Sequence, residues 1–317
     1  MTKLYMGIDT SNYTTSIGVV DEKENILFNS RIVLNVGEKS HGLRQQEAVF
    51  QHLNNLPILI KELTDIIDVK EIETISVSST PRNIADSYMP VFVVGKNQAF
   101  MLSRILNNKY KEFSHQEGHI AAGLLNYEKY LDEFISLHIS GGTTEILYVE
   151  NKIENFDIQI IGGSLDINFG QLIDRIGVYL GFKFPCGLEL EKFASNGKLL
   201  NINIPISIKE KYWTNISGLE NFFINLIDSK EYRKEDIIFT LFYTIGKIID
   251  KLIKSVTCNY DIEDILITGG VSANTYIRNL LQDNSKLNYI FPSVNLSTDN
   301  GVGIALLGKL KQGHRGC

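Results

Sequence analysis

Cysteine and proline are both scarce in this chain of 317 residues. The three cysteines, Cys186, Cys258 and Cys317, are too few for a disulfide framework, which fits a reducing compartment. Six prolines leave no room for a proline-rich linker. No apolar run reaches the roughly 18 residues needed to span a bilayer, and residues 1–10 lack the apolar core of a signal peptide. We therefore expect a cytoplasmic protein with no membrane partner.

An excess of basic residues is also missing. The 31 Lys and Arg are outnumbered by 37 Asp and Glu, which gives a formal net charge of −6. A long basic stripe that holds nucleic acid by charge alone is therefore not expected. Hydrophobic residues make up 44% of the chain, which is enough to form a real core. At roughly 100–200 residues per domain, the length predicts two compact domains.

Two stretches of the sequence follow one plan of strand, tight polar turn and strand. Residues 3–9 and 14–20 form the first pair, and 133–140 and 143–149 form the second. Apolar residues at helical spacing occupy 44–65, 93–107, 165–181, 233–257, 272–283 and 299–311.

The repeated plan predicts a duplicated α/β unit, with an N-terminal lobe over 1–128 and a C-terminal lobe over 129–317. We expect the last helix to pack back across the lobes. A ligand is expected in a cleft between them.

The sharpest local signal is the run HQEGH from His115 to His119. Positions i and i+4 of a helix share a face, so both imidazoles could reach one metal ion. The pattern is not the H-E-x-x-H of zinc proteases, because Glu117 stands two residues after the first histidine and points away from the ligand face. A metalloprotease is thus disfavoured. The alternative is a pair of ordinary surface histidines.

A site with two histidines needs at least one further ligand. Asp299, within the run STDNG, stands at an apparent junction of loop and helix. Its alternative role is an N-cap, which Thr298 or Asn300 could also fill. His138 lies on a predicted strand, and its alternative role is that of a buried, hydrogen-bonded histidine. Both Asp299 and His138 are candidate ligands.

Two glycine-bearing loops could bind phosphate or an acyl phosphate. The run SGGTT at 140–144 offers backbone N–H groups without a nearby Cβ, together with hydroxyl donors. The run GGVSAN at 269–274 leads from a strand into a helix, whose amides and dipole favour an anion. Neither run matches the P-loop or the dinucleotide-binding fingerprint. Each could also be a simple tight turn.

A third segment begins with the run GGSLD at 162–166. Asp166 is a plausible helix cap. Asp174 could bond a ribose hydroxyl, and its alternative role is a solvent-facing charge beside Arg175. No sequence feature lowers the pKa of the Cys186 thiol, so a structural cysteine is favoured over a nucleophile.

Together these segments resemble the TsaD family over nearly the whole chain. Its members are tRNA threonylcarbamoyladenosine synthases of the actin-like ATPase superfamily, with the legacy name O-sialoglycoprotein endopeptidase or peptidase M22. The matching positions are 7–11, 115–119, 140–144, 164, 166, 170, 174, 175, 185, 187, 217–219, 269–274 and 298–301. The resemblance implies two actin-like α/β lobes with a ligand cleft between them.

The resemblance also implies two bound groups. Family members bind one iron or zinc ion, for which the matching residues are His115, His119 and Asp299, with His138 as a further candidate ligand. They also bind an adenylate, either threonylcarbamoyl-AMP or ATP/AMP. The matching nucleotide and substrate residues are Ser140, Gly141, Gly142, Thr143, Asp174, Gly187, Gly270 and Asn274. Ser11 and Thr14 are candidates for the acceptor side.

The activity implied by the resemblance is an acyl transfer, not proteolysis. The threonylcarbamoyl group would move from threonylcarbamoyl-adenylate to N6 of the tRNA adenosine beside the anticodon. The metal would polarise the carbamate carbonyl, and no nucleophilic side chain would be required. Expected partners are tRNA and TsaB- and TsaE-like subunits.

The sequence also departs from the family pattern. The usual E-T-S-C-D-E-T reads DTSNYTT at 9–15, so the acidic residues are lost at Tyr13 and Thr14, and Glu220 replaces a typical lysine. One alternative is therefore a TsaD-like paralogue that uses a carbamoyl-type adenylate or ATP on a small-molecule or protein acceptor. A non-catalytic TsaB-like scaffold is a third possibility, disfavoured because such scaffolds lack the metal ligands.

Overall fold

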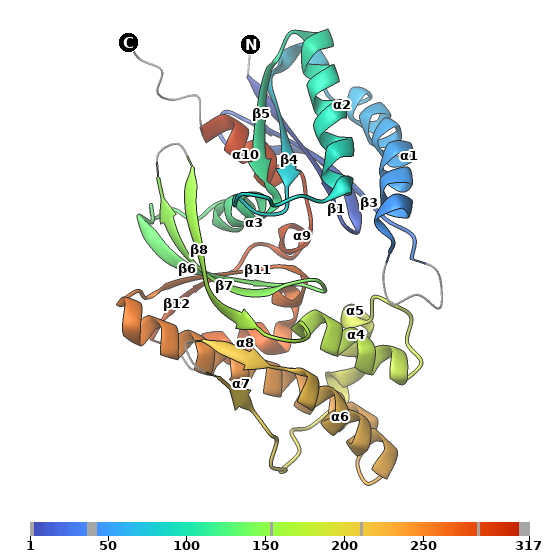
Figure 1. Ribbon diagram of the computed structural model, residues 1–317, viewed down its shortest axis with the longest axis vertical. Coiled ribbons are helices and arrows are strands. Elements are labelled where there is room, and N and C mark those ends of the chain that lie inside the picture. Colours follow the sequence, from blue (N-terminus) through green and yellow to red (C-terminus); the bar gives the residue numbers. More distant parts are fainter. Residues whose placement is uncertain (1–2, 37–42, 153–154, 210–211, 284–285, 311–317) are drawn as a thin grey trace. The chain divides into compact units, whose positions relative to one another are not determined.

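The computed structural model describes residues 3–36, 43–152, 155–209, 212–283 and 286–310, so Cys317 lies outside the described residues (Figure 1). The chain divides into two compact units. Unit 1 comprises Met1–Glu128, Lys152–Phe156 and Pro292–Cys317, and unit 2 comprises Lys129–Asn151 and Asp157–Phe291. None of the described helices combines the length and the apolar character that crossing a bilayer requires.

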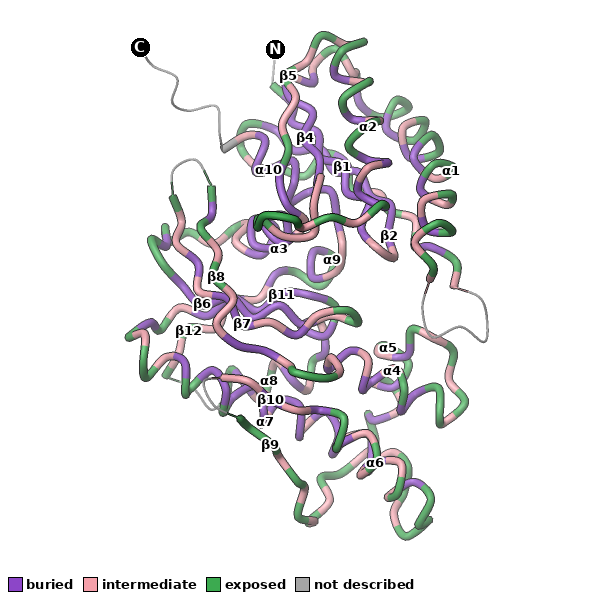
Figure 2. The backbone as a smooth tube through the Cα atoms, in the orientation of Figure 1, coloured by how far each residue is buried: buried purple, intermediate pink, exposed green. Residues whose placement is uncertain are grey.

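Unit 1 is built on a five-stranded sheet with the order β3-β2-β1-β4-β5. Strand β1 pairs antiparallel with β2 and parallel with β4. Every residue of β1 and β2 is buried, as the purple strands of Figure 2 show. Since successive side chains point to opposite faces, both faces of the sheet must be covered. The strands are β1 (Leu4–Ser11), β2 (Thr14–Asp21), β3 (Ile26–Val33), β4 (Ile72–Thr80) and β5 (Lys109–Ser114).

Helices cover the two faces of this sheet at glycines that permit close approach. A Cβ on Gly95 of α2 would lie 2.6 Å from Thr10 Oγ1, on one face of β1. On the opposite face, a Cβ on Gly7 would collide with the backbone of Ala305 in α10. The helices of unit 1 are α1 (Gln45–Thr64), the 3₁₀ helix η1 (Val69–Glu71), α2 (Pro90–Leu106), α3 (His115–Leu124), α9 (Val294–Ser297) and α10 (Val302–Leu310).

Unit 2 repeats this strand plan. Its sheet has the order β12-β11-β6-β7-β8-β10-β9, so β8-β7-β6-β11-β12 follows the same chain order as β3-β2-β1-β4-β5 of unit 1. The duplication expected from the sequence is thus present. The strands are β6 (Glu133–Ile139), β7 (Thr144–Asn151), β8 (Phe156–Ser164), β9 (Ser207–Ile208), β10 (Trp213–Asn215), β11 (Asp264–Thr268) and β12 (Asn288–Ile290).

The core of unit 2 is larger and rich in phenylalanine and isoleucine, with Phe169, Phe223 and Phe242 fully buried. Helix α7 carries much of it, because fourteen of its residues are buried. The helices are α4 (Phe169–Tyr179), α5 (Gly187–Phe193), η2 (Ala194–Asn196), α6 (Ser217–Ser229), α7 (Lys234–Tyr260), η3 (Gly270–Ala273) and α8 (Thr275–Asp283).

The structure has the predicted fold class, two α/β units around mixed sheets, but it groups the C-terminal segment differently. The sequence division places all of 129–317 in one lobe, whereas Pro292–Cys317 belongs to unit 1. The reason is packing: a Cβ on Gly303 would collide with the carbonyl oxygen of Gly118, so α10 and α3 meet backbone to backbone. The first boundary, after Glu128, is the same in both divisions.

Candidate metal site and anion-binding loops

The start of α3 fixes the two histidines of the HQEGH run. Ser114 is the N-cap, and its hydroxyl accepts the N–H of Glu117 at 3.2 Å. The Glu117 carboxylate in turn accepts the N–H of Ser114 at 2.8 Å, which completes a capping box. The cap holds His115 and His119 one turn apart on the same face. The Glu117 side chain takes part in this cap. As expected from the sequence, it does not lie on the face that carries the two histidines.

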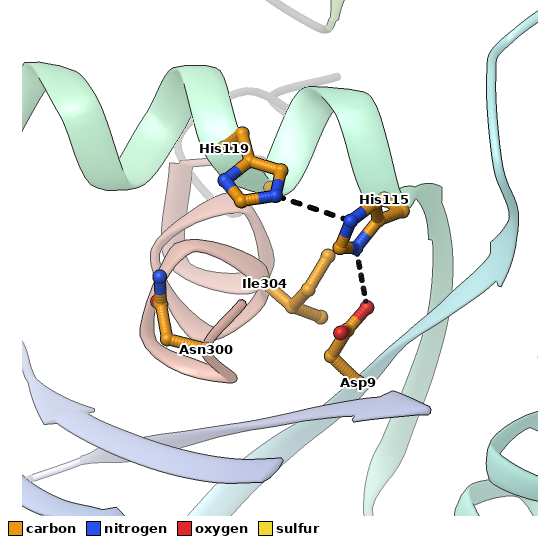
Figure 3. A pocket seen from close by; sticks show the side chains of 6 residues that line it. Asp9, His115, His119, Asn300 and Ile304 are labelled. Atoms are coloured by element: carbon orange, nitrogen blue, oxygen red, sulfur yellow. Dashed lines mark hydrogen bonds and ion pairs between the residues drawn. The ribbon is translucent and has the colours of Figure 1, made fainter. Parts of the chain in front are cut away.

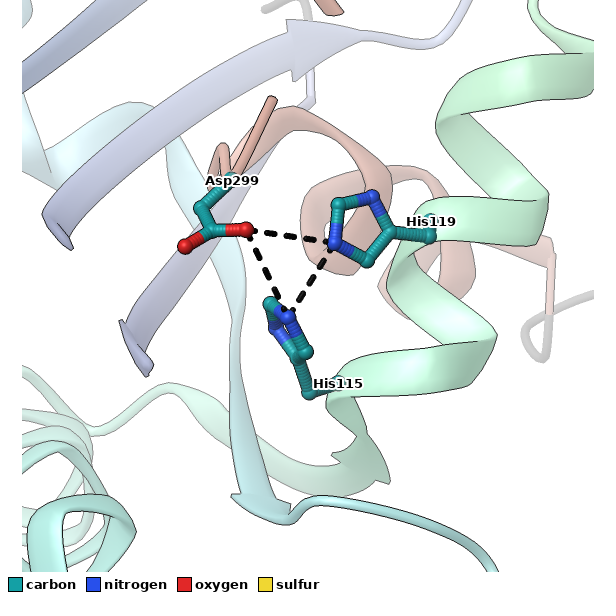
Figure 4. A group of neighbouring side chains, drawn as sticks. All are labelled: His115, His119 and Asp299. Atoms are coloured by element: carbon teal, nitrogen blue, oxygen red, sulfur yellow. Dashed lines mark hydrogen bonds and ion pairs between the residues drawn. The ribbon is translucent and has the colours of Figure 1, made fainter. Parts of the chain in front are cut away.

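Asp299 does not cap helix α10, because the next residue, Asn300, does so. The Asn300 side-chain oxygen accepts the N–H of Gly303 at 3.1 Å and so caps α10. Asp299 Oδ2 instead accepts a hydrogen bond from Ser11 Oγ at 2.7 Å. This contact leaves the second oxygen, Oδ1, directed at the two histidines (Figure 4).

Three donor atoms converge in unit 1. His115 Nε2 lies 3.1 Å from His119 Nε2, and Asp299 Oδ1 lies 3.3 Å from His119 Nε2 and 3.6 Å from His115 Nε2 (Figure 4). A tetrahedral ion with ligands at ~2.1 Å would separate its donors by ~3.4 Å. Two imidazoles and a carboxylate are donors that suit zinc or ferrous iron. The spacing and chemistry of these residues therefore fit one ion of the predicted kind.

Asp9 contacts the ring nitrogen of His115 that faces away from the three donor atoms. Its Oδ1 lies 2.9 Å from His115 Nδ1, and its side chain is fully buried (Figure 3). A proton held on Nδ1 by this carboxylate leaves the lone pair of Nε2 free for an ion. Asp9, His115 and His119 line a tight hollow together with Gly118, Asn300 and Ile304.

The electrostatics of the group favour a positive charge. Burial lowers the pKa of His115, but the charge and hydrogen bond of Asp9, with the charge of Asp299, raise it overall to about 9. Burial and the neighbouring His115 lower the pKa of His119. Burial raises the pKa of Asp299, yet the two histidines and Ser11 hold it well below its usual range. The buried carboxylate of Asp9 and the partly exposed carboxylate of Asp299 thus give this group a negative charge that a bound cation would balance.

The first glycine-bearing loop of unit 2 is a tight turn with open space above it. Ser140 N–H donates to the Thr143 carbonyl at 2.8 Å, and Gly142 N–H donates to Ser140 Oγ at 3.3 Å. Gly141 and Gly142 are exposed, and a Cβ on either would meet no atom within 4 Å. Helix α4 begins against this loop, since a Cβ on Gly170 would lie 2.5 Å from the Ser140 carbonyl oxygen. Loop amides and a helix N-terminus together suit an anion.

The second loop lies beside the first. Strands β6 and β11 pair in parallel, with His138 opposite Thr268, so the loops that follow them leave the same edge of the sheet. Gly269 has φ 90° and is close to the Ile139 backbone, a position that only glycine fits. Gly270 starts η3, and the side-chain oxygen of Asn274 accepts the N–H of Ile277 at 3.1 Å.

Asp174 faces inward instead of lying as a solvent-facing charge beside Arg175. Its Oδ1 accepts the N–H of Cys186 at 2.7 Å, and burial raises the pKa of Asp174 to about 6. Arg175 pairs with Glu220 at 2.8 Å instead. Burial raises the pKa of the Cys186 thiol to about 12, which agrees with a structural cysteine. Gly187 opens α5, and its Cβ position is empty.

The remaining predicted residues have structural contacts. His138 is buried in β6 of unit 2, with Nδ1 3.1 Å from Thr268 Oγ1, so it is a hydrogen-bonded strand histidine. Thr14 is buried at the start of β2. Asp166 caps a helix other than its own: its carboxylate accepts the N–H groups of Ile216 and Ser217 at the start of α6, at 2.8 and 3.1 Å.

Two supporting residues were not predicted from the sequence. Asp9 belongs to a recognisable motif, but its partner His115 is 106 positions away. Arg31 of β3 donates to the Asn295 carbonyl and to Thr298 Oγ1, and it carries no motif at all.

Comparison with known proteins agrees with this reading of the sequence. The family model described as TsaD, tRNA N6-adenosine threonylcarbamoyltransferase, matches residues 26–306. A protein of that name from Mycoplasmopsis synoviae is 30% identical over 312 residues, covering 97% of this chain and 98% of its own length. Another from a Sulfurihydrogenibium species is 32% identical, covering 96% of this chain and 89% of its own.

Solved structures share the fold at lower identity. HypF from T. kodakarensis matches with a TM-score of 0.61 and 16% identity, over 98% of this chain and 48% of that one. Component A of the Acidaminococcus fermentans (R)-2-hydroxyglutaryl-CoA dehydratase matches with a TM-score of 0.56 and 18% identity, over 98% of both chains. At these identities the likeness concerns the fold alone.

Proposed function

The chain belongs to the TsaD family of tRNA N6-adenosine threonylcarbamoyltransferases, and on that premise we propose its reaction. It transfers a threonylcarbamoyl group from threonylcarbamoyl-adenylate to N6 of the tRNA adenosine beside the anticodon. The observation that carries the proposal is the convergence of His115, His119 and Asp299, the residues that match the family's metal ligands, on one point. The residues of unit 2 that match its nucleotide site support it.

His115, His119 and Asp299 would hold one iron or zinc ion. When bound, the ion supplies Lewis-acid polarisation of the carbamate carbonyl. Asp9 keeps the proton of His115 on Nδ1, and Ser11 holds Asp299 Oδ2, so that the three donor atoms face one position. These contacts set the donors before any substrate arrives, which is the arrangement that electrostatic catalysis requires.

Unit 2 would hold the adenylate. The N–H groups of Gly141 and Gly142, the hydroxyls of Ser140 and Thr143 and the start of α4 bind the phosphate, since a helix N-terminus and a glycine turn both favour an anion. The residues proposed for ribose and base are Asp174, Gly187, Gly270 and Asn274. Asp174, with its pKa of about 6, is mostly ionised at neutral pH and can accept ribose hydroxyls.

No covalent intermediate on the chain is needed. The N6 amine of the acceptor attacks the carbamate carbon, the bond from that carbon to the phosphate oxygen breaks, and AMP leaves with the electron pair. The proton that N6 loses passes to the departing phosphate. The chain's task is to position both reactants and to bind the departing phosphate. Cys186 is excluded as a nucleophile by its burial and high pKa.

We propose that a TsaB-like subunit binds the outer face of α1 and α2. Large apolar side chains are exposed on both helices, and a group of such side chains on neighbouring helices is typical of a protein–protein contact. They are Phe50, Leu53 and Ile58 on α1 and Phe100, Met101 and Ile105 on α2. With a net charge of −6, the chain would depend on TsaB- and TsaE-like partners to complete a surface for tRNA.

Mass spectrometry of tRNA nucleosides tests the proposal directly. A strain that relies on this gene alone should contain threonylcarbamoyladenosine in its tRNA. Unmodified adenosine at that position, despite metal and AMP binding by the purified protein, would reject tRNA as the acceptor. The paralogue that acts on a small molecule or protein would then be favoured. The loss of the family's acidic residues at Tyr13 and Thr14 is the observation that keeps this second candidate open.

A further inference from the structure

Arg31 links the edge strand β3 to the segment that carries Asp299. Its Nη1 donates to the carbonyl oxygen of Asn295 at 3.2 Å and also to Thr298 Oγ1. Asn295 lies inside the four-residue helix α9, and Thr298 directly precedes Asp299. One guanidinium therefore contacts both Asn295 and Thr298, the latter being the residue just before Asp299.

Arg31 gives the helix carbonyl of Asn295 a donor from outside the helix. The carbonyls of so short a helix have almost no partners within it. Both bonds come from Nη1, whose two N–H groups lie in the rigid plane of the guanidinium, so one nitrogen can hold two acceptors in a fixed geometry. Strand β3 pairs with β2, with Arg31 opposite Ser16, and β2 pairs with β1. Arg31 thus connects the loop that carries Asp299 to the same sheet that carries Asp9 and Ser11.

Other contacts of the loop hold the Asp299 carboxylate or lie within the segment itself. Ser11 fixes the Asp299 carboxylate, and the Asn300 side chain donates to the carbonyls of Leu296 and Thr298 within the same segment. Among the described contacts of this loop, Arg31 supplies the tether from the sheet to Asn295 and Thr298.

We propose that Arg31 is a positioning residue of the metal centre: it holds Thr298 so that Asp299 Oδ1 stays in register with the two histidines. This inference rests on the proposed function, because it presupposes an ion at His115, His119 and Asp299. Sites of this kind tolerate only ~0.5 Å of displacement. Loss of an outer partner typically weakens metal affinity by ~10–100-fold. Arg31 is exposed, so its contribution to global stability is small.

The test compares zinc affinity, measured by competition with a chelator, with the urea midpoint of the full-length chain. Arg31→Met should bind zinc ~10-fold more weakly than the wild type, at a nearly unchanged urea midpoint. Arg31→Lys should fall between the two, because a lysine is a point charge without the fork. Lys109→Met is the matched control: Lys109 lies on β5, the opposite edge strand, where it pairs with Glu73 at 2.8 Å. It should bind zinc like the wild type.

Each other outcome has a definite meaning. Wild-type affinity in Arg31→Met would overturn the inference, and so would an equal loss in Lys109→Met, which would make net charge the cause. A loss of AMP or tRNA affinity at unchanged zinc affinity would make Arg31 a phosphate contact instead. If Arg31→Met also lowers the urea midpoint, the comparison passes to Arg31→Lys. Weaker zinc binding by Arg31→Lys at a wild-type urea midpoint then supports the inference, and wild-type zinc affinity overturns it. A wild type that binds no zinc or iron would reject the proposed function rather than the role of Arg31.

Discussion

Units 1 and 2 share the order of five strands but present different chemistry. The turn between β1 and β2 of unit 1 consists of Asn12 and Tyr13, whereas the equivalent turn between β6 and β7 of unit 2 contains Gly141 and Gly142. Unit 2 offers backbone N–H groups, while unit 1 offers the converging side chains of His115, His119 and Asp299. On the proposed function, the same scaffold serves an anion in one unit and a cation in the other, according to the residues on its loops and helices.

The two arrangements differ in what damages them. A site of side-chain donors is lost when one donor is removed, whatever the backbone does. A site of backbone donors is lost when a Cβ pushes the backbone aside, whatever polar side chains remain.

The largest effect is expected at the donors of unit 1. The double variant His115→Ala and His119→Ala should lose the bound metal, from about one equivalent to almost none, and transfer activity should fall by roughly 1000-fold. Metal is measured by mass spectrometry of the purified protein. Glu117→Gln is the control, because Glu117 serves only the helix cap and should keep the metal. Loss of metal in the control alone would contradict the assignment.

A buried histidine of unit 1, His52, predicts that the free energy of unfolding decreases at acidic pH. His52 is fully buried, with Nδ1 2.8 Å from Thr15 Oγ1, and Thr15 accepts a hydrogen bond from Asn55 at 3.2 Å. Burial lowers the pKa of His52 to about 4, against an opposing effect of the Asp9 charge. Because the unfolded chain binds the proton more readily, the free energy of unfolding should fall by ~3 kcal/mol as the pH drops from 6.5 to 4.

The His52→Gln variant isolates this effect from the other titrating groups. Urea unfolding of the wild type and the variant across pH 4–8 should show a slope between pH 4 and 6.5 that is smaller in the variant. Equal slopes would mean that His52 is already protonated in the folded chain.

A half-buried carboxylate of unit 2 predicts a pH dependence of stability with the opposite sign. Burial raises the pKa of Asp174 to about 6, although the N–H of Cys186 lowers it in part. The folded state therefore binds the proton more readily, and stability should decrease as the pH rises from 4 to 6. Allowing for partial solvent exposure, the decrease is ~2 kcal/mol. Asp174→Asn should be more stable than the wild type at pH 7.5 and equally stable at pH 4, as measured by urea unfolding.

The smallest effect is expected from one added methyl group in unit 2. Gly170→Ala places a Cβ 2.5 Å from the Ser140 carbonyl oxygen and should move the loop, weakening AMP binding by ~10-fold. Metal content should not change. Gly218→Ala is the control, because its Cβ would meet no atom within 4 Å. Calorimetry with AMP distinguishes them, and equal affinity in all three proteins would show that the loop does not bind the phosphate.

The sequence predicts what depends on local spacing. His115 and His119 share a face because they are four residues apart on a helix, and the glycine runs can be located because they follow apolar strands. The two-lobed α/β class follows from the repeated strand pairs. Strand β3 was not predicted, because it is an edge strand with an irregular exposure pattern and no clear alternation.

Contacts over long separations could not be predicted in this way. Asp9 meets His115 across 106 positions, and Arg31 meets Thr298 across 267. No periodicity in the sequence links such residues, because the contacts depend on how α3, α9 and α10 pack on the sheet. The same limit explains Asp166, which was expected to cap its own helix and caps α6 instead.

Unit 1 is built from both ends of the chain, and this division affects how it folds during translation. His119 and Asp299 are separated by 180 positions, which at ~5–20 residues per second is a delay of roughly 10–35 s. Throughout that time the nascent first lobe lacks α10, so its sheet presents an uncovered apolar face to the cell. Of the three proposed ligands, Asp299 is therefore synthesised last. A product truncated before residue 299 would lack both Asp299 and the covering helix α10.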